Sequence, residues 1–164
     1  MLHALQIITI ILVAVAMAPA LAHALEFPGK MRLDRDAYVT VQGIYYPGFT
    51  IAGVSEPLAL IAAVVLLLLT PQGTTAYWLR LVAASGMLLV QVIFWTFIQP
   101  VNRFWLRSSN VALGNVGGAF FAVDPQVGAG AGEVDWTKLR DRWEHSHLAR
   151  AALVFVSFLS LLLA

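Results

Sequence analysis

The sequence predicts an all-α integral membrane protein, a four-helix bundle with a long cytoplasmic extension of its last helix. Hydrophobic residues make up 60% of the 164 residues, and charged residues only 12%. A soluble domain carries roughly twice that share of charge, so much of this surface must face an apolar medium. Four stretches carry at most one Asp, Glu, Lys or Arg each, at about residues 2–25, 50–70, 75–98 and 147–164.

Each stretch is about long enough for a helix that crosses the bilayer, because about 20 residues span a hydrocarbon core roughly 30 Å thick. Unbroken apolar runs such as residues 64–69 lack the alternation of a β-barrel strand. The first stretch has a second interpretation, since Ala20-Leu21-Ala22 resembles the cleavage site of a signal peptide. No Lys or Arg precedes this stretch, and its apolar run is long for a leader, which favours a retained helix.

The chain is expected to form a single domain, residues 1–164, with long loops at residues 26–49 and 99–146. Nine of the ten Lys and Arg residues fall on the side of these loops, and Arg80 alone falls on the other side. The positive-inside rule then places both loops in the cytoplasm and both termini outside, in a bacterial inner membrane. Asp135 can cap a last helix that starts at Trp136, before the membrane begins. Glycine-rich residues 110–132 are either a slack connector or a flap against the headgroups.

Composition limits the classes of partner. The chain has no cysteine, which excludes disulfides and thiolate metal sites, and its net charge of +1 gives no reason to expect nucleic acid. The expected partners are membrane lipid, a small hydrophobic ligand, and a membrane protein or a second copy of this chain. Small residues permit close helix approach, within this bundle or with such a partner, at Ala83, Ala84, Ser85 and Gly86.

Polar and ionisable residues gather near the cytoplasmic ends of the predicted helices. Ionisable groups in or beside a membrane span are costly, and they indicate function with a partner for each charge. The predicted topology brings to one membrane face His23, Glu26, Glu56, Gln99, Asn102, Glu144, His147 and Arg150. We therefore expect a polar site at this face.

On the last helix, Trp143, His147 and Arg150 follow the i, i+4, i+7 spacing of a single helix face. The pair Glu144-x-x-His147 occurs in carboxylate-bridged metal sites of helical bundles, and His23 is a further candidate ligand. The same pair equally suits an interfacial ion pair. His23 and His147 could also ligate a haem, or one of them could act as a base.

Glu56 and Arg150 each have a structural and a functional interpretation. Glu56 precedes Pro57, so it either lies at the positive end of a helix or acts as a base toward a ligand. Arg150 either anchors the last helix in the headgroups or binds an anionic ligand.

Two short motifs carry a resemblance to a known family. The third stretch ends in Phe97-Ile98-Gln99-Pro100-Val101-Asn102, and the fourth opens with Trp143-x-x-x-His147-x-x-Arg150. With four short spans, these motifs resemble the anthrone-oxygenase-like family of small membrane proteins. The resemblance implies a membrane-embedded oxidoreductase that converts anthrones to anthraquinones, with a polar cluster of Asn102, Trp143, His147 and Arg150. Residues 23–49 depart from the pattern of the family's oxygenases, which leaves the substrate open.

We expect a protein that binds, and oxidises, a small hydrophobic ligand such as a polyketide or quinone. The catalytic candidates are His147 and Glu56, and the ligand-binding candidates are His23, Asn102, Trp143 and Arg150. Candidate metal ligands are His23, Glu144 and His147, and the cofactor is open between none, haem and a transition metal. The alternatives are an accessory subunit without chemistry and a haem- or metal-binding electron-transfer protein.

Overall fold

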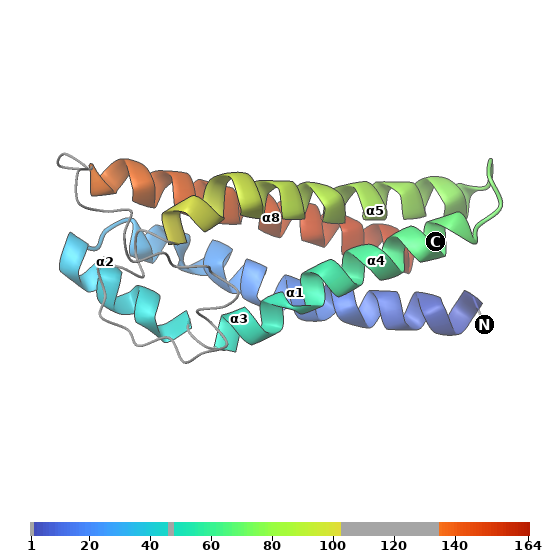
Figure 1. Cartoon of the computed structure of the whole chain (residues 1–164), viewed down its shortest axis with the longest axis horizontal. Coiled ribbons are helices and arrows are strands. Elements are labelled where there is room, and N and C mark those ends of the chain that lie inside the picture. Colours follow the sequence, from blue (N-terminus) through green and yellow to red (C-terminus); the bar gives the residue numbers. More distant parts are fainter. Residues whose placement is uncertain (1, 46–47, 103–134) are drawn as a thin grey trace.

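Four long helices run side by side in this computed structural model, which describes residues 2–45, 48–102 and 135–164 (Figure 1). They are α1 (Leu2–Lys30), α4 (Ser55–Leu68), α5 (Thr75–Ile93) and α8 (Trp136–Leu162). Three short helices follow α1 at one end of the bundle: α2 (Arg35–Gln42), η1 (Gly43–Tyr45) and α3 (Gly48–Gly53). No strand occurs in the described ranges, so the prediction of an all-α four-helix bundle is confirmed.

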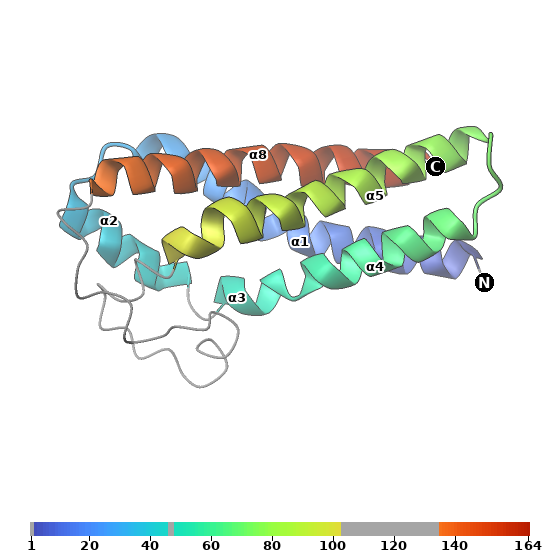
Figure 2. The same ribbon diagram turned by 45° about the horizontal axis from the view of Figure 1, so that its top comes forward.

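The long helices form a closed ring, in which α1 packs on α4 and α8, and α5 packs on the same two helices. Both chain ends and the α4–α5 turn lie at one end of the bundle, and α2 and α3 lie at the other (Figures 1 and 2). Apolar side chains fill the centre, among them Val13, Ala16, Leu66, Met87 and Val154.

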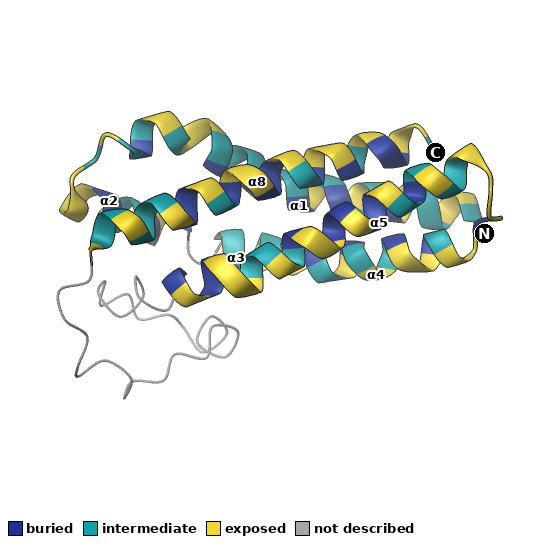
Figure 3. Ribbon diagram, turned by 90° about the horizontal axis from the view of Figure 1, so that it is seen from above, coloured by how far each residue is buried: buried dark blue, intermediate teal, exposed yellow. Residues whose placement is uncertain are grey.

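The outer faces of the bundle are apolar, which is the reverse of a soluble protein. Exposed residues run along the outside of each long helix (Figure 3). Ile8, Ile61, Leu88 and Val156 each leave about half of their surface uncovered. Four helical segments have the length and hydropathy needed to cross a membrane, and the second of them, Gly48–Leu68, combines α3 with α4. Lipid is the medium that matches such a surface, and the chain is therefore an integral membrane protein.

The start of α8 agrees with the sequence prediction, whereas the region after residue 26 differs from it in two ways. The Asp135 carboxylate accepts a hydrogen bond from the Thr137 amide, which confirms the predicted cap of α8. Hydrogen bonds from Thr137 also hold the pKa of Asp135 below its usual value. By contrast, α1 continues through Pro28 to Lys30, where the sequence predicted a loop from residue 26. A second helix, α2, also lies in that predicted loop.

The third span is not a uniform α-helix. After α5 the chain makes a π-helical turn, η2 (Phe94–Ile98), and then returns to helix up to Asn102. A π-turn accommodates one additional residue in a helical turn and occurs frequently at functional sites. The sequence predicted an uninterrupted helix here, because hydropathy does not distinguish a π-turn from an α-turn.

A buried arginine fastens the end of the bundle that carries the chain termini. Arg80 on α5 donates to the Thr70 hydroxyl at 2.6 Å and to the Gln6 amide oxygen at 2.5 Å. Gln6 on α1 then donates to the Leu161 carbonyl on α8 at 3.1 Å. These bonds connect three of the long helices with Thr70, two residues after the end of α4, so polar contacts close this end.

The close approach of α5 and α8 predicts one sensitive position. A Cβ atom at Gly86 would collide with the Ser157 hydroxyl and lie 3.3 Å from the Leu153 carbonyl oxygen. We expect Gly86→Val to destabilise the protein by about 1–3 kcal/mol, the usual cost of overpacking. Unfolding by SDS in mixed micelles measures this loss. Ser85→Val, on the exposed side of the same helix, is the control, and equal stability of the two variants would contradict the packing described.

Candidate functional site

A pocket of about 340 Å³ lies near the end of the bundle that carries α2 and α3. It is bounded by α1, η1, α3, α4, α5, η2 and α8, and most of its walls are aromatic or aliphatic. Every residue predicted to be catalytic or ligand-binding lines this pocket: His23, Glu56, Asn102, Trp143, His147 and Arg150. Their convergence on one cavity is therefore a structural fact, whereas the role of each residue stays a prediction.

Two histidines from different helices meet in the pocket. The rings of His23 on α1 and His147 on α8 lie edge to face, with centroids 4.3 Å apart. Both side chains are buried, at 6% and 5% exposure. Trp143 covers His147 with ring centroids 3.8 Å apart, and Tyr45 and Phe49 pack on His23 at 4.5 and 5.0 Å. The imidazoles therefore sit in an aromatic box that restricts how each ring can turn.

The hydrogen bond at Nδ1 fixes the tautomer of His147. This nitrogen lies 2.9 Å from the Trp143 carbonyl oxygen, one helical turn earlier. A carbonyl oxygen can only accept, so Nδ1 of the neutral ring must carry the proton. Nε2 then keeps its lone pair, and it has no hydrogen-bond partner among the described residues. His147 can therefore accept a proton from a ligand in the pocket.

The charged pair of the pocket links α4 to α8. Arg150 donates to Oε1 of Glu56, and Gln91 donates to Oε2 of the same carboxylate at 3.3 Å. The Arg150 guanidinium also lies 5.4 Å from the centre of the Phe94 ring. Each oxygen of Glu56 therefore has one donor, and the carboxylate is fixed between α5 and α8.

The polar end of the third span is attached to the last helix. The Trp143 indole nitrogen donates to the Asn102 side-chain oxygen at 2.7 Å. This bond fixes the plane of Trp143, the ring that covers His147. It also fixes the helical residues that follow the π-turn, and Phe94, Trp95 and Ile98 of that turn line the pocket.

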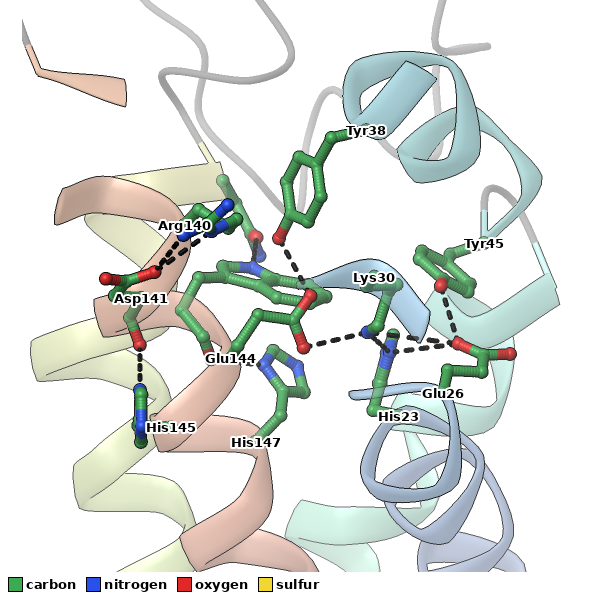
Figure 4. Close-up of polar contacts among 12 residues, drawn as sticks. His23, Glu26, Lys30, Tyr38, Tyr45, Arg140, Asp141, Glu144, His145 and His147 are labelled. Carbon is green, nitrogen blue, oxygen red and sulfur yellow. Dashed lines mark hydrogen bonds and ion pairs between the residues drawn. The ribbon is translucent and has the colours of Figure 1, made fainter. Parts of the chain in front are cut away.

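A second polar network lies beside the pocket and adds three residues that the sequence did not place in the site, Lys30, Tyr38 and Tyr45 (Figure 4). Lys30, 4% exposed, pairs with Glu144 at 2.9 Å and with Glu26 at 3.9 Å. The hydroxyl of Tyr38 donates to Glu144 at 2.9 Å, and that of Tyr45 donates to Glu26 at 2.6 Å. Burial and the nearby carboxylates raise the pKa of both tyrosines, so their hydroxyls remain donors at neutral pH.

Lys30 was not among the predicted site residues, because residues 26–49 were expected to form a loop in which Lys30 is a cytoplasmic charge. A usable signal was present in the spacing Glu26-x-x-x-Lys30, which favours an ion pair on a continuing helix. Pro28 concealed this signal, since proline normally marks a helix end. His145, in contrast, is exposed and bonds the Asp141 carbonyl at 2.7 Å, away from the pocket (Figure 4).

The candidate metal ligands do not form a cluster. Among the described residues, no group of three or more His, Cys, Asp or Glu side chains is arranged to hold a metal ion. Glu144 is engaged by Lys30 and Tyr38. The contact between His23 and His147 is also too close for one haem iron between the rings, because two metal–nitrogen bonds of about 2 Å each must fit there in addition to the rings.

Fold and site together define an integral membrane helical bundle with a buried aromatic pocket and a histidine pair. The family model described as anthrone oxygenase matches residues 44–160, and the chain belongs to this family. The resemblance carried by the two sequence motifs is thereby confirmed. Searches among curated proteins and among solved structures gave no match. The matched range includes His147 and the Glu56–Arg150 pair, whereas α1, with His23 and Lys30, precedes it.

Removal of one partner from the buried ion pair should be costly. Glu56→Ala leaves the Arg150 charge uncompensated, and we expect it to lower the free energy of unfolding by about 3–5 kcal/mol. The double variant Glu56→Ala/Arg150→Met should lose less, because no unpaired charge remains buried. SDS unfolding in mixed micelles provides the comparison. Lys138→Ala breaks an exposed ion pair with Asp135, and as a control it should change stability by less than about 1 kcal/mol. If Glu56→Ala were as stable as this control, Glu56 and Arg150 would not form a buried ion pair that stabilises the bundle.

Proposed function

We propose that the protein binds a small planar hydrophobic ligand, an anthrone-like polyketide or a quinol, and oxidises it with O₂. The observation that carries this proposal is the free Nε2 of His147 in an aromatic pocket. A cavity of about 340 Å³ falls within the range of small-molecule sites, about 300–1,000 Å³. Membership of the anthrone oxygenase family supports this reaction class.

For an anthrone-like ligand, the proposed reaction converts the ring methylene that lies across the central ring from the ketone into a second ketone. His147 Nε2 takes a proton from the ligand and leaves a carbanion that is delocalised onto the ketone oxygen. This electron-rich form is the reductant for O₂. One oxygen atom ends in the new carbonyl and the other leaves as water, so that CH₂ + O₂ gives C=O + H₂O. The four electrons lost by the carbon are the four gained by O₂.

The other pocket residues hold the ligand and the base in this proposal. Trp143 covers one face of the ring system and keeps His147 in place. Glu56 directs Arg150 and the Gln91 amide at the polar part of the pocket. Glu56 as a second base remains a prediction, and Glu56→Gln tests it because the amide keeps the shape of the side chain but cannot accept a proton.

The central test compares two histidines of the same helix. His147→Ala should lower the rate of anthrone or quinol oxidation by about 100-fold or more, since a positioned base typically contributes 10²- to 10⁴-fold. His145→Ala, which removes an exposed imidazole outside the pocket, should retain the wild-type rate. Product formation and O₂ uptake by purified protein in detergent are measured together. A fully active His147→Ala variant would refute the proposal.

We also propose that the protein lies in a bacterial inner membrane with the pocket toward the cytoplasm and both termini outside. The distribution of Lys and Arg along the sequence supports this orientation. Because the chain has no cysteine, a single introduced cysteine shows on which side of the membrane its position lies. In intact bacterial cells a membrane-impermeant maleimide should label Gln72→Cys, in the exposed α4–α5 turn, but not Lys138→Cys. Labelling of Lys138→Cys but not of Gln72→Cys would show the opposite orientation.

A further inference from the structure

His23, like His147, has a polar contact at one ring nitrogen. Its partner, Lys30, lies outside the pocket lining. Nδ1 of His23 lies 3.5 Å from the Lys30 ammonium, two helical turns along α1. Lys30 is 4% exposed and does not line the pocket. A buried lysine in contact with a pocket histidine needs an explanation, because its burial is costly.

Two carboxylates and an aromatic ring surround the Lys30 ammonium group and hold it beside His23. Glu144 and Glu26 lie on it at 2.9 and 3.9 Å, and the Trp143 ring centre is 5.0 Å from its nitrogen. Glu144 is itself held by the Tyr38 hydroxyl (Figure 4). An ammonium group has three protons to donate and no lone pair with which to accept.

The tautomer of His23 follows from this contact. Toward an ammonium group, Nδ1 must act as the acceptor, so the proton of the neutral ring resides on Nε2. His147 has the opposite arrangement, with the proton on Nδ1 and the lone pair on Nε2. The two rings lie in contact, with centroids 4.3 Å apart, and both line the pocket. Together they offer a ligand one acceptor and one donor.

We propose that Lys30 is a positioning residue that holds His23 as an Nε2–H donor toward a ligand oxygen. The pocket would then select ligands in which a ketone or hydroxyl oxygen is conjugated to the group that His147 deprotonates. As negative charge develops on this oxygen, the hydrogen bond from His23 strengthens and stabilises the anion. This inference rests on the proposed function for its consequence, but the tautomer of His23 exists without any ligand.

The first experiment is therefore made on the resting protein. Two-bond ¹H–¹⁵N correlation NMR of ¹⁵N-histidine-labelled protein in detergent distinguishes the two tautomers, with the signals of His23 identified from the variant His23→Gln. Wild-type His23 should be protonated on Nε2. A wild-type ring that is protonated on Nδ1 would overturn the inference at once, whether or not any variant folds.

Variants of Lys30 then test its role. In Lys30→Met the nearest charged group to Nδ1 is the Glu26 carboxylate, 4.0 Å away, which can only accept. We expect the tautomer of His23 to reverse in this variant and to be retained in Lys30→Arg, because a guanidinium also only donates. Lys138→Met removes an exposed lysine and should leave the His23 signals unchanged. Unchanged signals in Lys30→Met would overturn the role of Lys30.

Measurements of kcat and KM test whether the tautomer of His23 affects the reaction of the ligand. Loss of one donor to a developing oxyanion typically costs 10²–10³ in kcat, so Lys30→Met should lower kcat by about 100-fold with a small change in KM, and Lys30→Arg should restore most of it. A reversed tautomer with unchanged kcat would overturn the donor role. If wild-type protein oxidises no anthrone or quinol although His23 is protonated on Nε2, the proposed function fails and the tautomer assignment stands.

Discussion

The ion pair between Glu56 and Arg150 is the interaction on which the rest of the site depends. A charge that is buried in a lipid-embedded bundle needs a partner, because neither hydrocarbon nor an apolar core solvates it. Here each partner comes from a different helix, so the pair fixes α4 against α8 where the pocket lies. Gln91 on α5 adds a third helix through its bond to Glu56. The ion pair and the Gln91 bond tie together the helices that carry the polar wall of the cavity, and most of its other walls are aromatic or aliphatic.

The need of every polar group in a lipid-embedded bundle for a partner also explains which features the sequence could predict. Runs of apolar residues predict the four helices, since lipid leaves the chain few alternatives to helix. Rare ionisable residues near span ends, such as His23, Glu56, His147 and Arg150, predict the pocket, since each must find a partner in the bundle. Lys30 was missed because Pro28 normally ends a helix, and the π-turn at Phe94–Ile98 was missed because it leaves no trace in hydropathy. The glycine-rich residues 110–132 lie outside the described ranges, so their two interpretations stay predictions.

In the proposed function, the two histidines of the pocket come from two parts of the chain and have different roles. His147, in the range that matches the family, is anchored by its own helix backbone and keeps a free lone pair. His23 comes from α1, which precedes that range, and its Nδ1 contacts the side chain of Lys30. In this account the matched part supplies the base, and α1 supplies the group that recognises the ligand oxygen. Differences in α1 between proteins of this kind would then change the ligand and preserve the reaction.

The most direct test of the central claim is to locate the ligand. Benzophenone, a diaryl ketone of similar size to the proposed ligands, forms covalent bonds to nearby C–H groups under ultraviolet light, and peptide mass spectrometry identifies the residues modified. If the ligand binds in the pocket, benzophenone should label pocket residues such as Phe49, Ile98 and Trp143, and an excess of anthrone should suppress this labelling. Labels confined to outward-facing residues such as Ile61 and Leu88, or labels that anthrone does not suppress, would contradict it.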